Sequence, residues 1–112
     1  MRLMGRRIAV LVAEGVEELE FYVPLMRLQE EGAEVVPAAM DLKPVRGKNG
    51  LEIVPVAAVE SLHGSDLFAV VVPGGWSPNK LRLHPAVTRL IRETAAACNT
   101  LGFIFHGGLV AI

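Results

Sequence analysis

Short apolar runs alternate along this chain with stretches of helical spacing, and this alternation constrains the fold more than any other feature. Residues 7–13 (RIAVLVA) are apolar after Arg7 and include several β-branched side chains, as is typical of a strand buried on both faces. Further strands are predicted at residues 34–40, 67–72 and 101–105. Because helical stretches separate these runs, the sequence predicts an α/β fold with a mostly parallel sheet and helices on both faces.

Two stretches between the strands have the pattern of amphipathic helices. Residues 17–31 have helical periodicity, with an apolar set predicted at Leu19, Val23, Met26 and Leu28 and a solvated set at Arg27, Gln29, Glu30 and Glu31. Pro24 lies inside this stretch, and we expect it to kink the helix or to begin a second one, because proline lacks an N–H and clashes with the preceding turn. Residues 85–98 have the cleaner pattern, with His84 near the N-cap and Pro85 at the first helical position.

The segment between the second and third strands predicts a small β-hairpin. Residues 44–57 contain the run Gly-Lys-Asn-Gly at 47–50, and Asn-Gly is a strong signal for a tight turn. A second local expectation concerns Pro37, inside the strand predicted at 34–40. Its missing N–H favours an edge strand or a bulge.

Composition limits the class of protein. With 112 residues the chain is one domain at most, and 52% of its residues are hydrophobic, which is rich for so short a chain. Such an excess of hydrophobic residues suggests a missing partner or a missing part of the fold.

The cysteine count and the absence of targeting signals bear on location. The single cysteine excludes an intrachain disulfide, and no signal peptide or membrane-spanning run is recognisable, so we expect a cytoplasmic protein. The net charge of −1 gives no reason to expect nucleic acid as a partner.

Loops that follow parallel strands lie at the same edge of a sheet, where open α/β folds place their chemistry. We therefore expect residues 14–15, 73–75 and 106–107 to be neighbours. Glu20, about one turn into the first predicted helix, could lie over this edge and share a proton with a nucleophile or orient one. The alternative is an acid that the positive end of the helix favours, which is how we interpret Glu14, Glu17 and Glu18.

Gly74 and Gly75 come directly after a predicted strand. Without side chains, they let backbone N–H groups approach an anion or a developing oxyanion. The alternative is simply a tight exit from the strand. No Gly-Lys-Ser/Thr follows the glycines, and the chain has no GxGxxG, so this turn is not a phosphate loop. We expect neither a cofactor nor a metal.

The last predicted strand runs into a turn and the start of a helix, which is the pattern of an elbow that lifts one side chain above the sheet. Phe105 stands at the tip of this elbow. Its benzyl side chain cannot act as nucleophile, acid, base or ligand. His106 follows beside Gly107 and is a candidate catalytic residue, with a structural role as the alternative.

These spacings resemble those of the DJ-1/PfpI family, a branch of the class I glutamine amidotransferase-like superfamily, and are most similar to its PfpI-like branch. The resemblance covers nearly the whole chain and implies a flavodoxin-like (Rossmann-like) fold. It also implies dimers or larger oligomers, and a cysteine on the elbow that serves peptidase, amidase or glyoxalase-type chemistry. It is carried by RIAVLVAEGVEELEFYVPLMRLQEEGAEV, VRGKNGLEIVPVAAV, FAVVVPGGWSPNKLRLHPAVTRLIRE and FIFHGGLVAI.

The resemblance also assigns roles to single residues. Glu20 matches the acid that contacts the family's cysteine thiol, Gly74 and Gly75 match its anion-binding turn, and His106 matches the histidine of its Cys-His-Gly run. Three departures accompany these matches. Phe105 occupies the position of the cysteine, Asn79 occupies that of an acid in the PfpI-like branch, and the family's closing elements after the elbow are absent, so residues 1–112 are expected to form one shortened domain.

Three functions remain open at this point. The first is a family member that has lost cysteine-dependent catalysis and persists as a fold, a binding module or a stress-related protein. The second is an active hydrolase or lyase, either because Phe105 is not the natural residue or because Cys98 or His106 substitutes. The third is an oligomeric chaperone-like module. The expected partners are further copies of this chain and a small carbonyl or peptide ligand, with no membrane and no nucleic acid.

Overall fold

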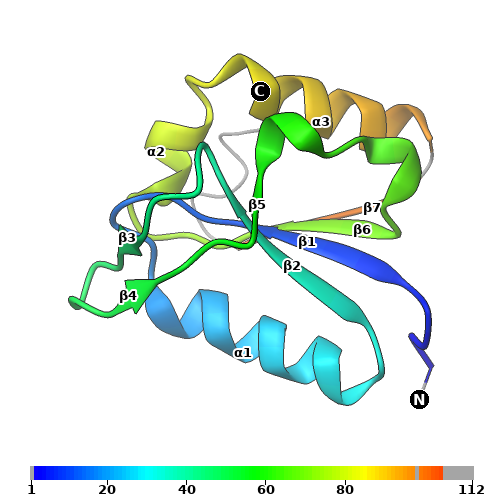
Figure 1. Ribbon diagram of the computed structural model, residues 1–112, viewed down its shortest axis with the longest axis horizontal. Helices are drawn as coiled ribbons and strands as arrows, with labels where there is room; N and C mark the ends of the chain where they lie inside the picture. The colour runs from blue at the N-terminus through cyan, green and yellow to red at the C-terminus, as the bar shows by residue number, and fades with distance from the viewer. Residues whose placement is uncertain (1, 98, 105–112) are drawn as a thin grey trace.

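The central element of the fold is a five-stranded sheet whose neighbouring strands are all parallel (Figure 1). A computed structural model describes residues 2–97 and 99–104. The sheet order is β5-β2-β1-β6-β7, with β1 (Arg7–Leu11), β2 (Glu34–Ala39), β5 (Ala57–Ala58), β6 (Ala69–Val72) and β7 (Thr100–Phe103). The helices are α1 (Glu18–Glu30), α2 (Ser77–Leu81) and α3 (Pro85–Ala96), with 3-10 turns at η1 (Val59–Ser61) and η2 (Gly64–Asp66). Since α1 and α3 lie on opposite faces of the sheet, the predicted architecture is confirmed.

The first helix passes through Pro24 as one element, so the second helix that the proline suggested does not form. Phe21 before the proline and Leu25 after it pack against the same buried cluster, and this burial holds both halves of α1 in place. The predicted start of α3 is confirmed, because the His84 side chain accepts a hydrogen bond from the N–H of Ala86 at 3.3 Å. The helix ends slightly earlier than predicted, at Ala96.

The expectation that Pro37 marks an edge strand is wrong. Strand β2 has β1 on one side and β5 on the other. The Pro37 carbonyl accepts from the N–H of Val56 at 2.9 Å, so this residue's backbone faces the side of β5, which begins only at Ala57. The missing N–H of the proline therefore interrupts no bond of the ladder between β2 and β5.

The hairpin is confirmed in a short form. Strands β3 (Val45–Arg46) and β4 (Glu52–Ile53) pair antiparallel, and the N–H of Gly47 donates to the carbonyl of Leu51 at 2.8 Å. The residues after β4 leave the hairpin and join the main sheet as β5. Neither α2 nor the two 3-10 turns was predicted.

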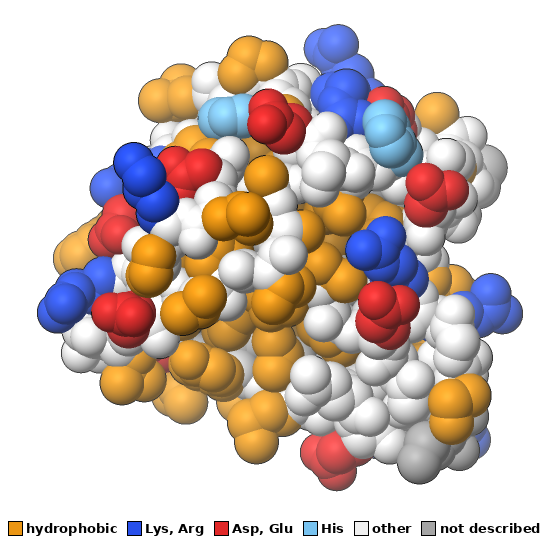
Figure 2. All heavy atoms as spheres, in the orientation of Figure 1, with side chains coloured by type: hydrophobic (Ala, Val, Ile, Leu, Met, Phe, Trp, Pro, Cys, Tyr) orange, Lys and Arg blue, Asp and Glu red, His pale blue; other side chains and the backbone are white. Residues whose placement is uncertain are grey.

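Several large apolar side chains remain at the surface. On α1, Leu19, Val23 and Met26 follow one another at helical spacing and are exposed by 70%, 59% and 58%, so the apolar face predicted for this helix is not the one that it buries. Phe21 is buried instead, because it lies on the side of the helix that packs on the sheet. Figure 2 shows hydrophobic side chains gathered over the middle and lower part of the face that the figure presents. No helix described within residues 2–97 and 99–104 combines the length and the apolar character that crossing a bilayer requires.

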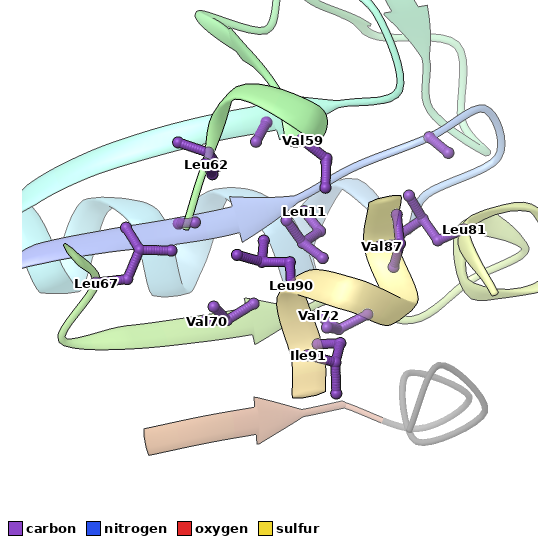
Figure 3. Close-up of a cluster of buried hydrophobic side chains, with 13 residues drawn as sticks. Leu11, Val59, Leu62, Leu67, Val70, Val72, Leu81, Val87, Leu90 and Ile91 are labelled. Carbon is purple, nitrogen blue, oxygen red and sulfur yellow. The ribbon is translucent and has the colours of Figure 1, made fainter. Parts of the chain in front are cut away.

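The core lies on both faces of β1, whose side chains alternate between them. Ala9 and Leu11 belong to the cluster beneath α3, whereas Val10 belongs to the cluster that contains Phe21 of α1. Figure 3 shows the cluster beneath α3, in which Leu90 and Ile91 of that helix lie against side chains of the sheet. A strand buried on both faces explains why residues 8–13 are apolar throughout. The ends of β1 and β6 are thereby fixed, and their loops carry the candidate site.

Candidate active site at the carboxyl edge of the sheet

The loops after β1 and β6 meet at the carboxyl edge of the sheet. The chain leaves β1 toward β2 on one side, and β6 lies on the other, so the gap between β1 and β6 is the topological switch point of this sheet. An isolated antiparallel bridge joins Val16 to Gly75. Around it, the N–H of Trp76 donates to the carbonyl of Gly15 at 2.9 Å, and the N–H of Glu17 donates to that of Gly74 at 3.3 Å. Two of the three loops predicted to be neighbours are therefore in contact.

The structure brings Glu20 and the glycine turn together. The Oε1 atom of Glu20 accepts a hydrogen bond from the N–H of Gly74 at 2.8 Å, across 54 positions of sequence. The side chain is half-buried, so its carboxylate keeps access to the edge of the sheet. An acid in this position can exchange a proton with a group bound at the turn. Its catalytic role stays a prediction.

Gly75 presents the N–H group that is available at this turn. The neighbouring N–H, that of Gly74, is occupied by Glu20, whereas the N–H of Gly75 has no hydrogen-bond partner among residues 2–97 and 99–104. Gly75 adopts a φ of +78°, and a Cβ atom placed on it would lie 2.5 Å from the N atom of Glu17. Only glycine fits this position without strain. The turn can thus offer one backbone donor to an oxyanion, rather than two.

Sequence reasoning missed the role of Glu18. We interpreted it as an acid favoured by the helix end, but its side chain is only 4% exposed and binds the hairpin. Its carboxylate accepts from the N–H of Asn49 at 2.8 Å and from that of Leu51 at 3.1 Å, and from the Asn49 side chain at 2.9 Å. No local pattern could have shown this, because donors and acceptor are more than 30 residues apart.

Two opposing effects act on the pKa of Glu18. Burial raises it, but hydrogen bonds from the backbone N–H groups of Leu51, Glu18 itself and Asn49, and from the Asn49 side chain, outweigh burial and hold the pKa below its ordinary value of 4.5. The ionised form is therefore the one that the fold stabilises.

This lowered pKa predicts a loss of stability in acid. A carboxylate with a lowered pKa in the folded state contributes stability that is present above pH 4.5 and is lost as the pH falls through the folded-state pKa. We expect the free energy of unfolding to decline in that range, and to decline less steeply in Glu18→Gln. Urea denaturation of both proteins between pH 3 and 7, a range chosen to span the ordinary carboxyl pKa of about 4, measures the difference. Identical pH profiles would contradict the assignment.

A cation and an aromatic ring lie at the rim of the site. The Nζ atom of Lys48, on the hairpin loop, is 5.8 Å from the centre of the Trp76 ring and 3.6 Å from Oε2 of Glu17. The Trp76 side chain is 58% exposed, although its Cβ packs close to the backbone of Gly15. Sequence reasoning did not single out either residue. An exposed ring and a nearby ammonium group can both contact a ligand at this edge.

Of the other residues that the sequence placed at the site or as alternatives to it, the structure describes only Asn79. Asn79 is exposed on α2, at the position where the PfpI-like pattern has an acid. Phe105, His106 and Gly107 lie outside the described residues, and so does Cys98. The third loop of the predicted site is therefore not placed. In the part of the chain that the structure covers, no group of three or more His, Cys, Asp or Glu residues is arranged to hold a metal ion.

Comparison with known proteins gives the family. The sequence profile of the DJ-1/PfpI family matches residues 6–112, and the chain belongs to this family. It is 39% identical to a protein of Bacillus subtilis named putative cysteine protease YraA, over 97% of this chain and 65% of that protein. It is 28% identical to deglycase PfpI of Pyrococcus furiosus, over 95% of this chain and 64% of that protein.

Solved structures agree with the family and the fold. A two-domain protein of Anabaena variabilis, with DJ-1/ThiJ/PfpI-like and ferritin-like domains, superposes with a TM-score of 0.91 at 30% identity, over 94% of this chain and 31% of that one. The flavodoxin-like α/β fold is thus confirmed. The chain spans about 60–65% of the length of curated relatives such as those above.

Proposed function

We propose that this chain retains the acid and the anion-binding turn of a DJ-1/PfpI site but has lost cysteine-dependent catalysis. The observation that carries the proposal is the contact between Glu20 and Gly74, at 2.8 Å, on a chain with phenylalanine at the position of the family's cysteine. Relatives named putative cysteine protease and deglycase support peptides and small carbonyl compounds as ligand classes.

The retained groups suit a ligand that carries a carbonyl group. The N–H of Gly75 can donate to the carbonyl oxygen, and the Glu20 carboxylate can accept a proton from, or return one to, a group beside it. Covalent attack needs a nucleophilic atom with a lone pair at the elbow position, and the side chain of Phe105 contains no such atom. The site should therefore bind such a ligand without turning it over.

Assays of the unmodified chain test this proposal. We expect no consumption of methylglyoxal and no cleavage of a peptide amide above the buffer rate, whereas methylglyoxal should shift the fluorescence of Trp76, the only tryptophan of the chain. Turnover of either compound by the unmodified chain would reject the loss of catalysis. Absence of both turnover and binding would leave suppression of client aggregation, the chaperone-like function, as the activity to measure.

We further propose that the chain associates with copies of itself. The exposed apolar row of α1 (Leu19, Val23 and Met26) supports this, because contiguous apolar surface on a small domain favours association. Light scattering at micromolar concentration should give a mass at least twice the 12.1 kDa of one chain. Val23→Lys should reduce that mass. A clean monomer of the unmodified chain would contradict the proposal.

A further inference from the structure

We propose that Glu18 is a positioning residue for the site at the carboxyl edge of the sheet. Its buried carboxylate fixes the hairpin loop 46–51, and that loop fixes the glycine turn through the segment 14–17, which lies between them. The use of this turn in ligand binding rests on the proposed function. The coupling from Glu18 to the turn rests on geometry alone.

The first step is the hold that Glu18 has on the loop. Both carboxylate oxygens are used, with Oε1 bound by the Asn49 side chain at 2.9 Å and Oε2 by the backbone N–H groups of Asn49 at 2.8 Å and Leu51 at 3.1 Å. A Cβ atom on Gly47 would overlap the Glu18 carboxyl group, so the loop backbone is packed directly on it. Hydrogen bonds to a charged acceptor are stronger than those between neutral groups, and here several of them are made to the buried Glu18 carboxylate.

The second step joins the loop to the segment 14–17. The N–H of Lys48 donates to the carbonyl of Val16 at 2.8 Å, and the N–H of Gly15 donates to the carbonyl of Arg46 at 2.9 Å. The N–H of Arg46 in turn donates to the Glu14 side chain at 3.0 Å. The segment and the loop thus exchange backbone hydrogen bonds in both directions, so a displaced loop leaves backbone groups of the segment unpaired.

The third step joins the segment to the turn. A Cβ atom on Gly75 would lie 2.5 Å from the N atom of Glu17 and 2.6 Å from the carbonyl oxygen of Gly15. The bond from the N–H of Trp76 to the Gly15 carbonyl, at 2.9 Å, ties the residue after the turn to the same segment. With this little space, the segment cannot move without moving the turn. The hairpin, the segment and the turn therefore behave as one unit that Glu18 anchors.

Glu18→Gln tests the coupling, with Glu52→Gln as its control. Both changes replace a carboxylate by an amide on or against the hairpin, but Glu52 is exposed on β4. In Glu18→Gln we expect the backbone amides of Asn49 and Leu51 to exchange with deuterium about tenfold faster or more, a change equivalent to about 1.4 kcal/mol. The amides of Glu17 and Trp76, which join the segment to the turn, should also exchange faster, while those in the middle of β1 should not. Trp76 fluorescence should shift in Glu18→Gln and stay constant in Glu52→Gln.

Other outcomes would overturn the proposal. Faster exchange confined to residues 47–51 would show that the loop moves without the turn, and a uniform increase that includes β1 would show a general loss of stability. If Glu18→Gln does not fold, Asn49→Ala, at an exposed loop residue, removes the side-chain bond to the Glu18 carboxylate together with a 3.4 Å bond to Oε1 of Glu17. The amide of Trp76 is then the one that reports the coupling, and it should exchange faster by a smaller factor than in Glu18→Gln. An Asn49→Ala spectrum with an unchanged amide at Trp76 would reject the coupling.

A second readout separates this inference from the proposed function. Methylglyoxal titration of the Trp76 fluorescence should give weaker binding in Glu18→Gln than in Glu52→Gln. If the unmodified chain does not bind methylglyoxal, the proposed function fails, while the exchange pattern still decides whether Glu18 positions the turn. If binding is present and equal in both variants with the exchange pattern as expected, the coupling holds but the assignment of Glu18 as a positioning residue for the site is rejected.

Discussion

Replacing Phe105 by Cys is expected to give the chain methylglyoxal turnover that the unmodified protein lacks. The change restores a thiol at the position where the family has its cysteine, beside His106 in the sequence. Because covalent catalysis depends on the nucleophile, we expect a gain on the order of 10³-fold or more over the unmodified chain. Consumption of methylglyoxal by the two proteins, at equal concentration and near neutral pH, measures it.

Phe105→Ala is the matched control for this gain. Like Phe105→Cys, it replaces the aromatic side chain by a small one, but it brings no lone pair. We expect Phe105→Ala to remain as inactive as the unmodified chain, which also shows that Cys98 does not act as a substitute. Equal activity in Phe105→Ala and Phe105→Cys would contradict a role for the thiol. Inactivity of Phe105→Cys would contradict a site that is intact apart from its nucleophile.

Gly75→Ala is expected to destabilise the fold by about 2–5 kcal/mol, the sum of a left-handed backbone and an overpacked site. The residue has a φ of +78°, and its new Cβ would lie 2.5 Å from the N atom of Glu17 and 2.6 Å from the Gly15 carbonyl oxygen. These neighbours are backbone atoms that the bridge between Val16 and Gly75 holds, so they cannot turn aside like a side chain. Chemical denaturation gives the difference in free energy of unfolding.

Gly50→Ala separates the two causes. Gly50 has a φ of +96°, yet a Cβ placed on it would meet no atom within 4 Å. Gly50→Ala should therefore lower the free energy of unfolding only by the cost of the left-handed backbone, about 1–2 kcal/mol. A Gly75→Ala protein no less stable than Gly50→Ala would show that the turn is not packed against the segment 14–17 as described.

The order of strands and helices could be predicted because it depends on patterns that are local in the sequence. A strand buried on both faces must be apolar throughout, as residues 8–13 are, and the N-cap and first turn of α3 are marked by His84 and Pro85. Where prediction was wrong, tertiary contacts overrode a local preference. Pro24 stays within one helix because Phe21 and Leu25 are held on the same cluster.

The candidate site was predictable only in part. Parallel strands require the loops after β1 and β6 to meet, so the neighbourhood of Glu20 and Gly74 followed from topology. The separate roles of Glu18 and Glu20 could not be predicted from topology, because the two residues are less than one helical turn apart and yet bind different partners. Glu18 binds a loop more than 30 residues away, and no spacing rule within α1 indicates this.

One measurement tests the central claim that Glu20 and the glycine turn are the retained parts of a catalytic site. It is the rate of methylglyoxal turnover in Phe105→Cys compared with the double variant Phe105→Cys/Glu20→Gln, with Phe105→Cys/Glu30→Gln as the control for an exposed acid of the same helix. A proton-transferring acid accounts for a factor of about 10² to 10⁴. We expect Glu20→Gln to lower the rate by about 100-fold or more and Glu30→Gln to leave it within about twofold of its parent, a change of less than about 0.5 kcal/mol. Equal rates in the two double variants would contradict the claim.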